Sequence, residues 1–120
     1  MQLLTQSQRK QLAANYATNH DPATGFEVDA PVDHLPVVKF FNPCSSGTWL
    51  FSMMAPGDVL YGLCDLGWGC PELGDMSLDE MAAVKIKPFG LGIERDRHFT
   101  ANKTLGAYAA EAREAGHIVA

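Results

Sequence analysis

The sequence predicts an α+β fold: an antiparallel sheet of four to five strands with a short inserted helix, flanked by N- and C-terminal helices. Runs rich in β-branched and aromatic residues are separated by tight turns in the middle of the chain. Helix-capping signals occur near both ends. Strands joined by tight turns pair in antiparallel fashion, and we expect the helices to pack on one face of the sheet.

The length of 120 residues suits one domain. We expect a single domain over 1–120, with an N-terminal helix and loop over 1–35, a sheet core over 36–104 and a C-terminal helix over 105–120. The 47% apolar and 19% charged composition is typical of a folded globular protein.

The first element is predicted to be a helix over 5–19. Thr5 and Gln8 have the spacing of a capping box, in which each side chain pairs with an otherwise free backbone N–H. Leu12 and Tyr16 then share one helical face, four residues apart. Because this apolar stripe is thin, we expect the helix to lean against the domain instead of occupying its centre.

The segment 20–35 is predicted to be a long surface connection. Pro22, Gly25 and Pro31 interrupt it, and it holds four acidic residues but neither Lys nor Arg. Connections of this length are uncommon inside compact domains, so it is either a functional loop or a tether for the first helix.

Four strands follow, each bounded by turn residues. They are expected over 37–41, 48–54, 59–64 and 72–76. The tripeptide at 56–58, Pro-Gly-Asp, predicts a tight turn that joins the second and third strands into a hairpin.

The last part of the chain is predicted to alternate helix, strand and helix. A Ser-Leu-Asp-Glu capping box opens a short helix over about 77–86. Alternating residues over 92–99 predict a final strand. Thr104 is expected to cap a C-terminal helix that ends at Gly116.

Charge and cysteine content restrict the cellular setting. Fourteen acidic and nine basic residues give a net charge of −5, and the basic residues are scattered, so direct binding of nucleic acid is not expected. Three cysteines, an odd and sparse count, indicate a reducing compartment. The N-terminus lacks the apolar core of a signal peptide, and no apolar run is long enough for a membrane span. We expect a cytoplasmic protein with no membrane contact.

Several motifs in the middle of the chain resemble a known family. The runs are PVVKFFNP, TWLF, LYGLCDLG, PELGDMSLDEM and PFGLGIERDRHF. In this order and spacing, over about 36–104, the chain resembles the bacterial family called domain of unknown function 2958. Departures are Asp75 and Met76, where the family usually has an aromatic pair, and the segment 64–70. The resemblance implies accessory genes of plasmids and integrated mobile elements, and it supplies no catalytic residues and no cofactor.

The densest charge cluster is the run Glu-Arg-Asp-Arg-His in the last predicted strand. Alternation would place Glu94, Asp96 and His98 on one face, with Arg95 and Arg97 on the other. We favour an exposed strand face with cross-strand ion pairs.

A metal site is the alternative hypothesis for these acids. With Glu72 or Asp75 from a neighbouring strand, they could hold Mg²⁺ or Mn²⁺. The protein would then be a small metal-dependent hydrolase or nuclease acting through Glu72, Glu94, Asp96 and His98.

Two further constellations are weaker. Cys64, Cys70, His34 and His98 could hold zinc, but five residues separate the cysteines, more than is usual for a structural finger. The Cys-Ser-Ser-Gly run at 44–47 has no acyl-transfer signature around it and is predicted to be an interstrand loop. We therefore predict no catalytic residue, no metal site and no cofactor.

The preferred hypothesis is a non-enzymatic interaction module. Trp49 is predicted to be in the core, whereas Trp68, between glycines, is either exposed as an anchor for a protein partner or folded over the sheet edge. An acidic rim made of the loop 20–35 and the turn 67–71 would dock an unidentified protein by charge complementarity. The candidate binding residues are Trp68, Glu72, Glu94, Arg95, Asp96 and Arg97.

Overall fold

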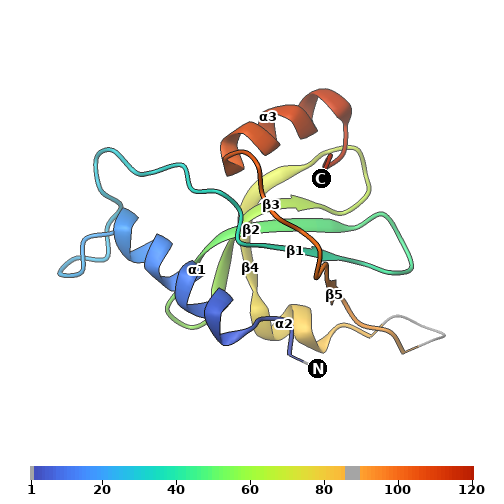
Figure 1. Ribbon diagram of the computed structural model, residues 1–120, viewed down its shortest axis with the longest axis horizontal. Helices are drawn as coiled ribbons and strands as arrows, with labels where there is room; N and C mark the ends of the chain where they lie inside the picture. The colour runs from blue at the N-terminus through green and yellow to red at the C-terminus, as the bar shows by residue number, and fades with distance from the viewer. Residues whose placement is uncertain (1, 86–89) are drawn as a thin grey trace.

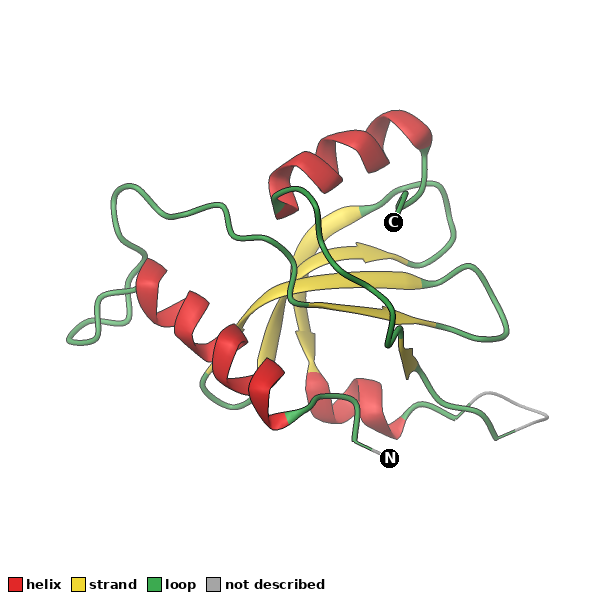
Figure 2. Cartoon of the chain, in the orientation of Figure 1, coloured by secondary structure: helices red, strands yellow, loops and turns green. Residues whose placement is uncertain are grey.

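The computed structural model of the chain describes residues 2–85 and 90–120 (Figure 1). The predicted α+β class and the order of its elements are confirmed (Figure 2). The elements are α1 (Gln6–Asn19), β1 (Val38–Phe41), β2 (Thr48–Ala55), β3 (Val59–Asp65), β4 (Glu72–Ser77), α2 (Leu78–Ala83), β5 (Glu94–Arg95) and α3 (Leu105–Ala115). None of the helices in these described ranges combines the length and the apolar character needed to cross a membrane.

The five strands form one antiparallel sheet in the order β4-β3-β2-β1-β5. The turn at 56–58 joins β2 to β3 as predicted. Gly57 has φ 83° and Asp58 has φ 57°, and aspartate is among the residues that tolerate this left-handed conformation. The strands therefore follow one another as a meander until β5, which returns to the free side of β1.

Helices cover both faces of the sheet, so the prediction that they share one face was wrong. One face packs Phe40, Phe51 and Leu60 against α1 and α2, and the other packs Leu50 and Leu63 against α3. Figure 1 shows α3 on one side of the sheet, with α1 and α2 on the other. The physical reason is in β2, whose six central residues are all buried; such a strand needs cover on both faces.

Helix α1 begins with the predicted capping box. The Gln8 N–H donates to Thr5 Oγ1 (3.1 Å), and the Thr5 N–H donates to Gln8 Oε1 (3.0 Å). The inner face of the helix buries Leu12 together with two amide side chains, Asn15 and Asn19. Asn15 Nδ2 donates to the Ser52 carbonyl oxygen (2.9 Å) on β2, so polar contacts supplement the thin apolar stripe.

The long connection after α1 is held against the end of that helix by hydrogen bonds between the Asn19 side-chain amide and the backbone of Val32. Asn19 Nδ2 donates to the Val32 carbonyl oxygen and Asn19 Oδ1 accepts from the Val32 N–H, both at 2.9 Å. His20 and Glu27 form an isolated antiparallel bridge at the base of the same loop. These contacts fold the loop back over the end of α1, where it borders the pocket described below.

Two elements are shorter than predicted. Helix α2 ends at Ala83 and not near Ile86, which lies outside the described residues. The strand predicted over 92–99 is reduced to two residues, because Asp96 turns the chain: its Oδ1 accepts from the His98 N–H (2.9 Å) and its carbonyl oxygen accepts from the Phe99 N–H (3.4 Å). Side-chain bonding of this kind competes with strand pairing.

Helix α3 has both predicted ends. Thr104 Oγ1 accepts from the Ala107 N–H (3.3 Å), and Gly116 closes the helix at φ 80°. Its inner face buries Tyr108 and Ala112 against the sheet.

Candidate functional site

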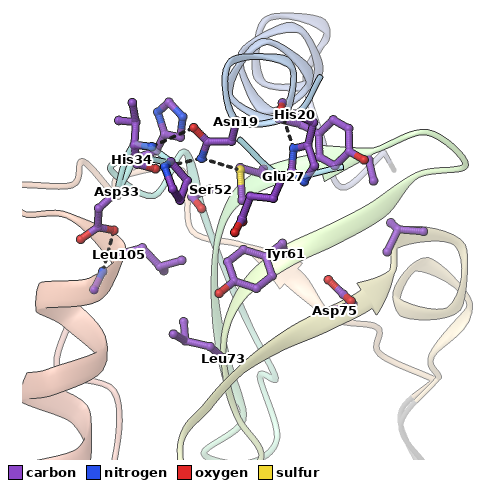
Figure 3. Close-up of a pocket in the computed structure, with 17 residues that line it drawn as sticks. Asn19, His20, Glu27, Asp33, His34, Ser52, Tyr61, Leu73, Asp75 and Leu105 are labelled. Carbon is purple, nitrogen blue, oxygen red and sulfur yellow. Dashed lines mark hydrogen bonds between the residues drawn. The ribbon is translucent and has the colours of Figure 1, made fainter. Parts of the chain in front are cut away.

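A pocket of about 320 Å³ lies between the loop 20–35, the α3-covered face of the sheet and the beginning of α3 (Figure 3). Strands β2, β3 and β4 contribute its floor, and the end of α1 contributes one wall. Several of its lining residues are apolar or aromatic: Tyr16, Val32, Met53, Tyr61, Leu73 and Leu105. A concave site with such walls and a few polar groups is the usual form of a binding pocket.

The sheet places two functional groups in one row. Tyr61 on β3 lies directly opposite Asp75 on β4, and Leu63 lies opposite Leu73. Residues opposite each other in an antiparallel pair point to the same face, so Tyr61, Leu73 and Asp75 all lie on the pocket side. Figure 3 shows these three side chains along the sheet wall of the pocket.

The opposite wall is fixed by hydrogen bonds from the loop to the beginning of α3. Asp33 Oδ1 accepts from the Gly106 N–H (3.0 Å), and the His34 carbonyl oxygen accepts from the Leu105 N–H (2.9 Å). The first N–H groups of a helix have no partner within it, so the loop satisfies them from outside. A Cβ at Gly106 would lie 2.5 Å from Asp33 Oδ2, so a larger residue there would require this carboxylate to shift.

The pocket is electrostatically one-sided. Glu27, Asp33 and Asp75 line it, and none of the described residues around it is Lys or Arg. Burial raises the pKa of the Tyr61 phenol, and the charges of Asp75, Glu27 and Asp33 raise it further. Three carboxylates, two from the loop 20–35 and one from β4, therefore act on one phenol oxygen, and the pocket favours positive charge.

We expect Asp75→Asn to lower the pKa of Tyr61, because the substitution removes the strongest of the negative charges that oppose ionisation of the phenol. The measurement is an NMR titration of the tyrosine ring signals in the folded protein. Asp79→Asn, on the exposed surface of α2, is the matched control and should leave the titration unchanged. An unaltered Tyr61 titration in the Asp75 variant would contradict this electrostatic description.

Aromatic and imidazole groups complete the α1 side of the pocket. The rings of Tyr16 and His20 stack with centroids 3.8 Å apart, and His20 Nδ1 lies 2.8 Å from the Tyr16 carbonyl oxygen. His34 also lines the pocket, and its buried Nε2 atom has no hydrogen-bond partner in the structure. The site therefore offers ring faces beside its carboxylates.

The acids proposed for a metal-dependent enzyme are not brought together. Glu72 lies on β4 and Glu94 on β5, at opposite edges of the sheet. Four inter-strand spacings of about 4.8 Å separate those edges by about 19 Å. The alternative hypothesis of a metal-dependent enzyme requires these two carboxylates to converge with Asp96 and His98, and they do not, because β5 pairs with β1 and not beside β4.

The charged run after β5 has structural contacts instead. Arg95 Nη1 donates to the Leu3 carbonyl oxygen (2.7 Å), and Asp96 forms an ion pair with Lys39 (3.6 Å). Arg97 and His98 line a shallow groove beside them. Throughout 2–85 and 90–120, no three side chains from His, Cys, Asp and Glu form a group that could hold a metal ion, so the zinc set of Cys64, Cys70, His34 and His98 is not assembled either.

The family comparison covers nearly the whole chain. The model of the family described as "Protein of unknown function (DUF2958)" matches residues 3–119. The chain belongs to this family. The match extends beyond 36–104 at both ends, so α1 and α3 are part of the DUF2958 fold. No curated protein and no solved structure matches the chain.

The sequence run that most resembles DUF2958 builds the turn after β5. Its part from 90 to 99 contains β5 and the Asp96 turn, whereas Pro88 and Phe89 lie outside the described residues. The charged residues 94–98 of this run therefore belong to a hydrogen-bonded turn, and the pocket lies in another part of the DUF2958 fold.

The cysteines of this DUF2958 protein are free thiols. Cys44 is exposed in the β1–β2 loop, as expected for a plain interstrand loop, and Cys70 is also exposed. Cys64 is half-buried beside the core cluster on the α1 side of the sheet. Burial, followed by the charge of Asp75, raises its pKa to about 11.

We expect Cys64 to resist alkylation in the folded protein, because only the thiolate reacts. A pKa of about 11 in place of 9.0 lowers the thiolate fraction about 100-fold at mildly alkaline pH. The measurement is the rate of iodoacetamide labelling in a variant with Cys44→Ser and Cys70→Ser, with the same protein in denaturant as the control. Equal rates in the two states would disprove the shift.

Trp68 is 81% exposed, between Gly67 at φ 87° and Gly69 at φ 81°, whereas Trp49 is in the core as predicted. The two parts of the predicted acidic rim are separate, however. Figure 1 shows the loop 20–35 at one end of the sheet and the β3–β4 turn at the other. The idea of one continuous rim was therefore wrong; the binding role of Trp68 stays a prediction.

The pocket residues Glu27, Asp33 and Tyr61 were not identified from the sequence. The one available signal was the acidic character of the loop 20–35, which has four acids and no basic residue. The position of this loop against β3, β4 and α3 depends on hydrogen bonds of Asn19 and Asp33, which no local sequence pattern predicts.

Proposed function

We propose that this protein is a non-enzymatic interaction module that receives a Lys or Arg side chain of a partner protein in the pocket beside Tyr61. The observation that carries this proposal is the lining itself: apolar and aromatic walls, three carboxylates, and no Lys or Arg among the described residues around it. We further propose that it acts in the cytoplasm as an accessory protein of mobile DNA, the setting that the family resemblance implies. Its basic partner would be a host or element-encoded protein.

The chemistry of the walls favours a long cationic side chain. The aliphatic stem of Lys or Arg is compatible with Leu73 and Leu105, while its charged end is attracted by Asp75 and Glu27. The ring faces of Tyr16 and Tyr61 add cation–π attraction. The volume of about 320 Å³ is at the small end for ligand pockets and suits one side chain better than a large cofactor.

The lining supports binding more than catalysis. Ser52 is the hydroxyl nucleophile candidate among the described lining residues besides the tyrosines, and it is only 2% exposed. Among the described residues, no hydrogen bond joins Ser52 to His20 or His34, and His20 instead faces the Tyr16 carbonyl oxygen. A nucleophile needs an adjacent base, and this arrangement does not supply the pair.

The test uses N-acetyl-arginine N′-methylamide as a probe in amide NMR titrations of the full chain. We expect weak binding, with Kd on the order of 1 mM, as suits a single side chain. Shifts should concentrate at Tyr61, Leu73 and Leu105, and Asp75→Asn should weaken binding several-fold. Asp79→Asn is the matched control for the loss of one negative charge. Shifts spread evenly over the acidic surface, or binding that is equal in both variants, would refute the proposal.

A further inference from the structure

We infer that the partner presents its basic residue from an extended segment that adds to the outer edge of β4 as a sixth strand. This inference rests on the proposed function and specifies how the partner reaches the pocket. Four features support it: the edge itself, its continuity with the pocket, its charge, and the contrast with the other edge.

Strand β4 is the outermost strand on its side of the sheet. In the described chain it is paired with β3 alone, and it is six residues long. Glu72, Leu73 and Asp75 are exposed, and a Cβ built at Gly74 would have nothing within 4 Å. An exposed outer strand leaves a row of backbone N–H and C=O groups unpaired, which is the template for strand addition.

The pocket begins at this edge. Leu73 and Asp75 belong to β4 and line the pocket, and Tyr61 is the next residue inward in the row that contains Asp75. An added strand would lie about 4.8 Å outside β4, with a side chain about 5 Å from the Asp75 Cβ on the same face. Lys or Arg at that position is long enough to reach Asp75 and then Tyr61.

The edge selects a basic segment over a second copy of this chain. The nine residues from 72 to 80 contain four carboxylates and no Lys or Arg. Two copies paired edge to edge would bring these like charges together, which is destabilising. A segment with alternate Lys or Arg would instead meet Asp75 on the pocket side, and its approach would be accelerated by the net charge of −5.

The opposite edge of the sheet offers no comparable site among the described residues. Strand β5 is two residues long, and the Asp96 turn follows at once. Strand addition of a basic segment is therefore specific to β4.

The experiment uses the full chain and an acetylated, amidated peptide of alternating Val and Arg, seven residues long, with Glu in place of Arg as the charge control. Two further peptides carry N-methyl groups on alternate residues, one on each of the two possible sets. In an added strand only one set of peptide N–H groups faces β4, so one N-methylated peptide should lose at least tenfold in affinity while the other binds normally. Amides of β4 that do not bond β3 should gain protection from hydrogen exchange only when the peptide is bound.

The outcomes separate this inference from the proposed function. If the arginine amide binds in the pocket but both N-methylated peptides bind as well as their parent, the pocket is correct and strand addition is refuted. If neither the amide nor the peptide binds, the proposed function fails as well. If β4 amides are protected without peptide, in step with a concentration-dependent dimer in sedimentation, the edge pairs with a second copy and the inference is overturned.

Discussion

Gly62→Ala is expected to destabilise the fold by about 3 kcal/mol, enough to remove much of the stability of a small domain. Gly62 lies in the middle of β3, and a Cβ there would lie 2.7 Å from Phe51 Cα and 2.8 Å from the Leu50 carbonyl carbon. Both atoms belong to the backbone of β2, so no side-chain rotation relieves the clash. The β2–β3 register is also irregular between Phe51 and Met53, consistent with a close approach of the two strands.

The matched control is Gly74→Ala, because Gly74 is the direct partner of Gly62 in the β3–β4 register. A Cβ there meets nothing within 4 Å, so the substitution should be neutral or stabilising by up to about 1 kcal/mol. Urea unfolding followed by circular dichroism measures both variants. Similar midpoints for the two alanines would show that β2 does not approach β3 as closely as described.

Asp65→Ala is expected to cost about 2–4 kcal/mol of stability, since Asp65 is 2% exposed and accepts two backbone hydrogen bonds. Its Oδ1 accepts from the Gly67 N–H (2.8 Å), and its Oδ2 accepts from the Ile118 N–H (3.0 Å). The substitution leaves both donors without their partner and releases the segment after α3 from the end of β3. Removing the buried carboxylate recovers part of its desolvation cost, which keeps the expected loss below the sum of two charge-assisted bonds.

Asp21→Ala is the control for the Asp65 variant. Asp21 Oδ1 accepts from the Ala23 N–H (2.8 Å), the same two-residue spacing as Asp65 and Gly67, but this turn is exposed. Its loss should change the free energy of unfolding by less than about 0.5 kcal/mol. An Asp65 variant as stable as the Asp21 variant would mean that the carboxylate does not hold the two segments together.

Local signals predicted most of the fold. The caps at Thr5, Ser77 and Thr104 and the stop at Gly116 were all found where the sequence indicated them. Each of these contacts joins residues that are close in the chain, so it can be recognised without knowledge of the tertiary structure. The same is true of the turn at 56–58, which fixes the central hairpin.

Side-chain hydrogen bonds, one within a local turn and one between distant segments, decided what the sequence did not predict. The run 92–99 alternates like a strand, yet the Asp96 side chain accepts a hydrogen bond from the His98 N–H, and β5 ends at Arg95. The pocket requires Asp33 to meet Gly106, which is 73 residues away in the chain. Alternation and capping do not encode such a pairing, so the acids around Tyr61 were overlooked, and the alternative hypothesis grouped acids of β4 and β5 that lie at opposite edges of the sheet.

The amide side chains on the inner face of α1 fix the position of this helix on the sheet. Leucines alone tolerate a slide by one turn, because apolar contact has no direction, but a displaced Asn15 would lose the Ser52 oxygen and a displaced Asn19 would lose both Val32 bonds. Because these hydrogen bonds form only in one position of α1, the helix also fixes the shape of the pocket wall that it contributes. Substitutions on the exposed surface of α1 should leave that shape unchanged.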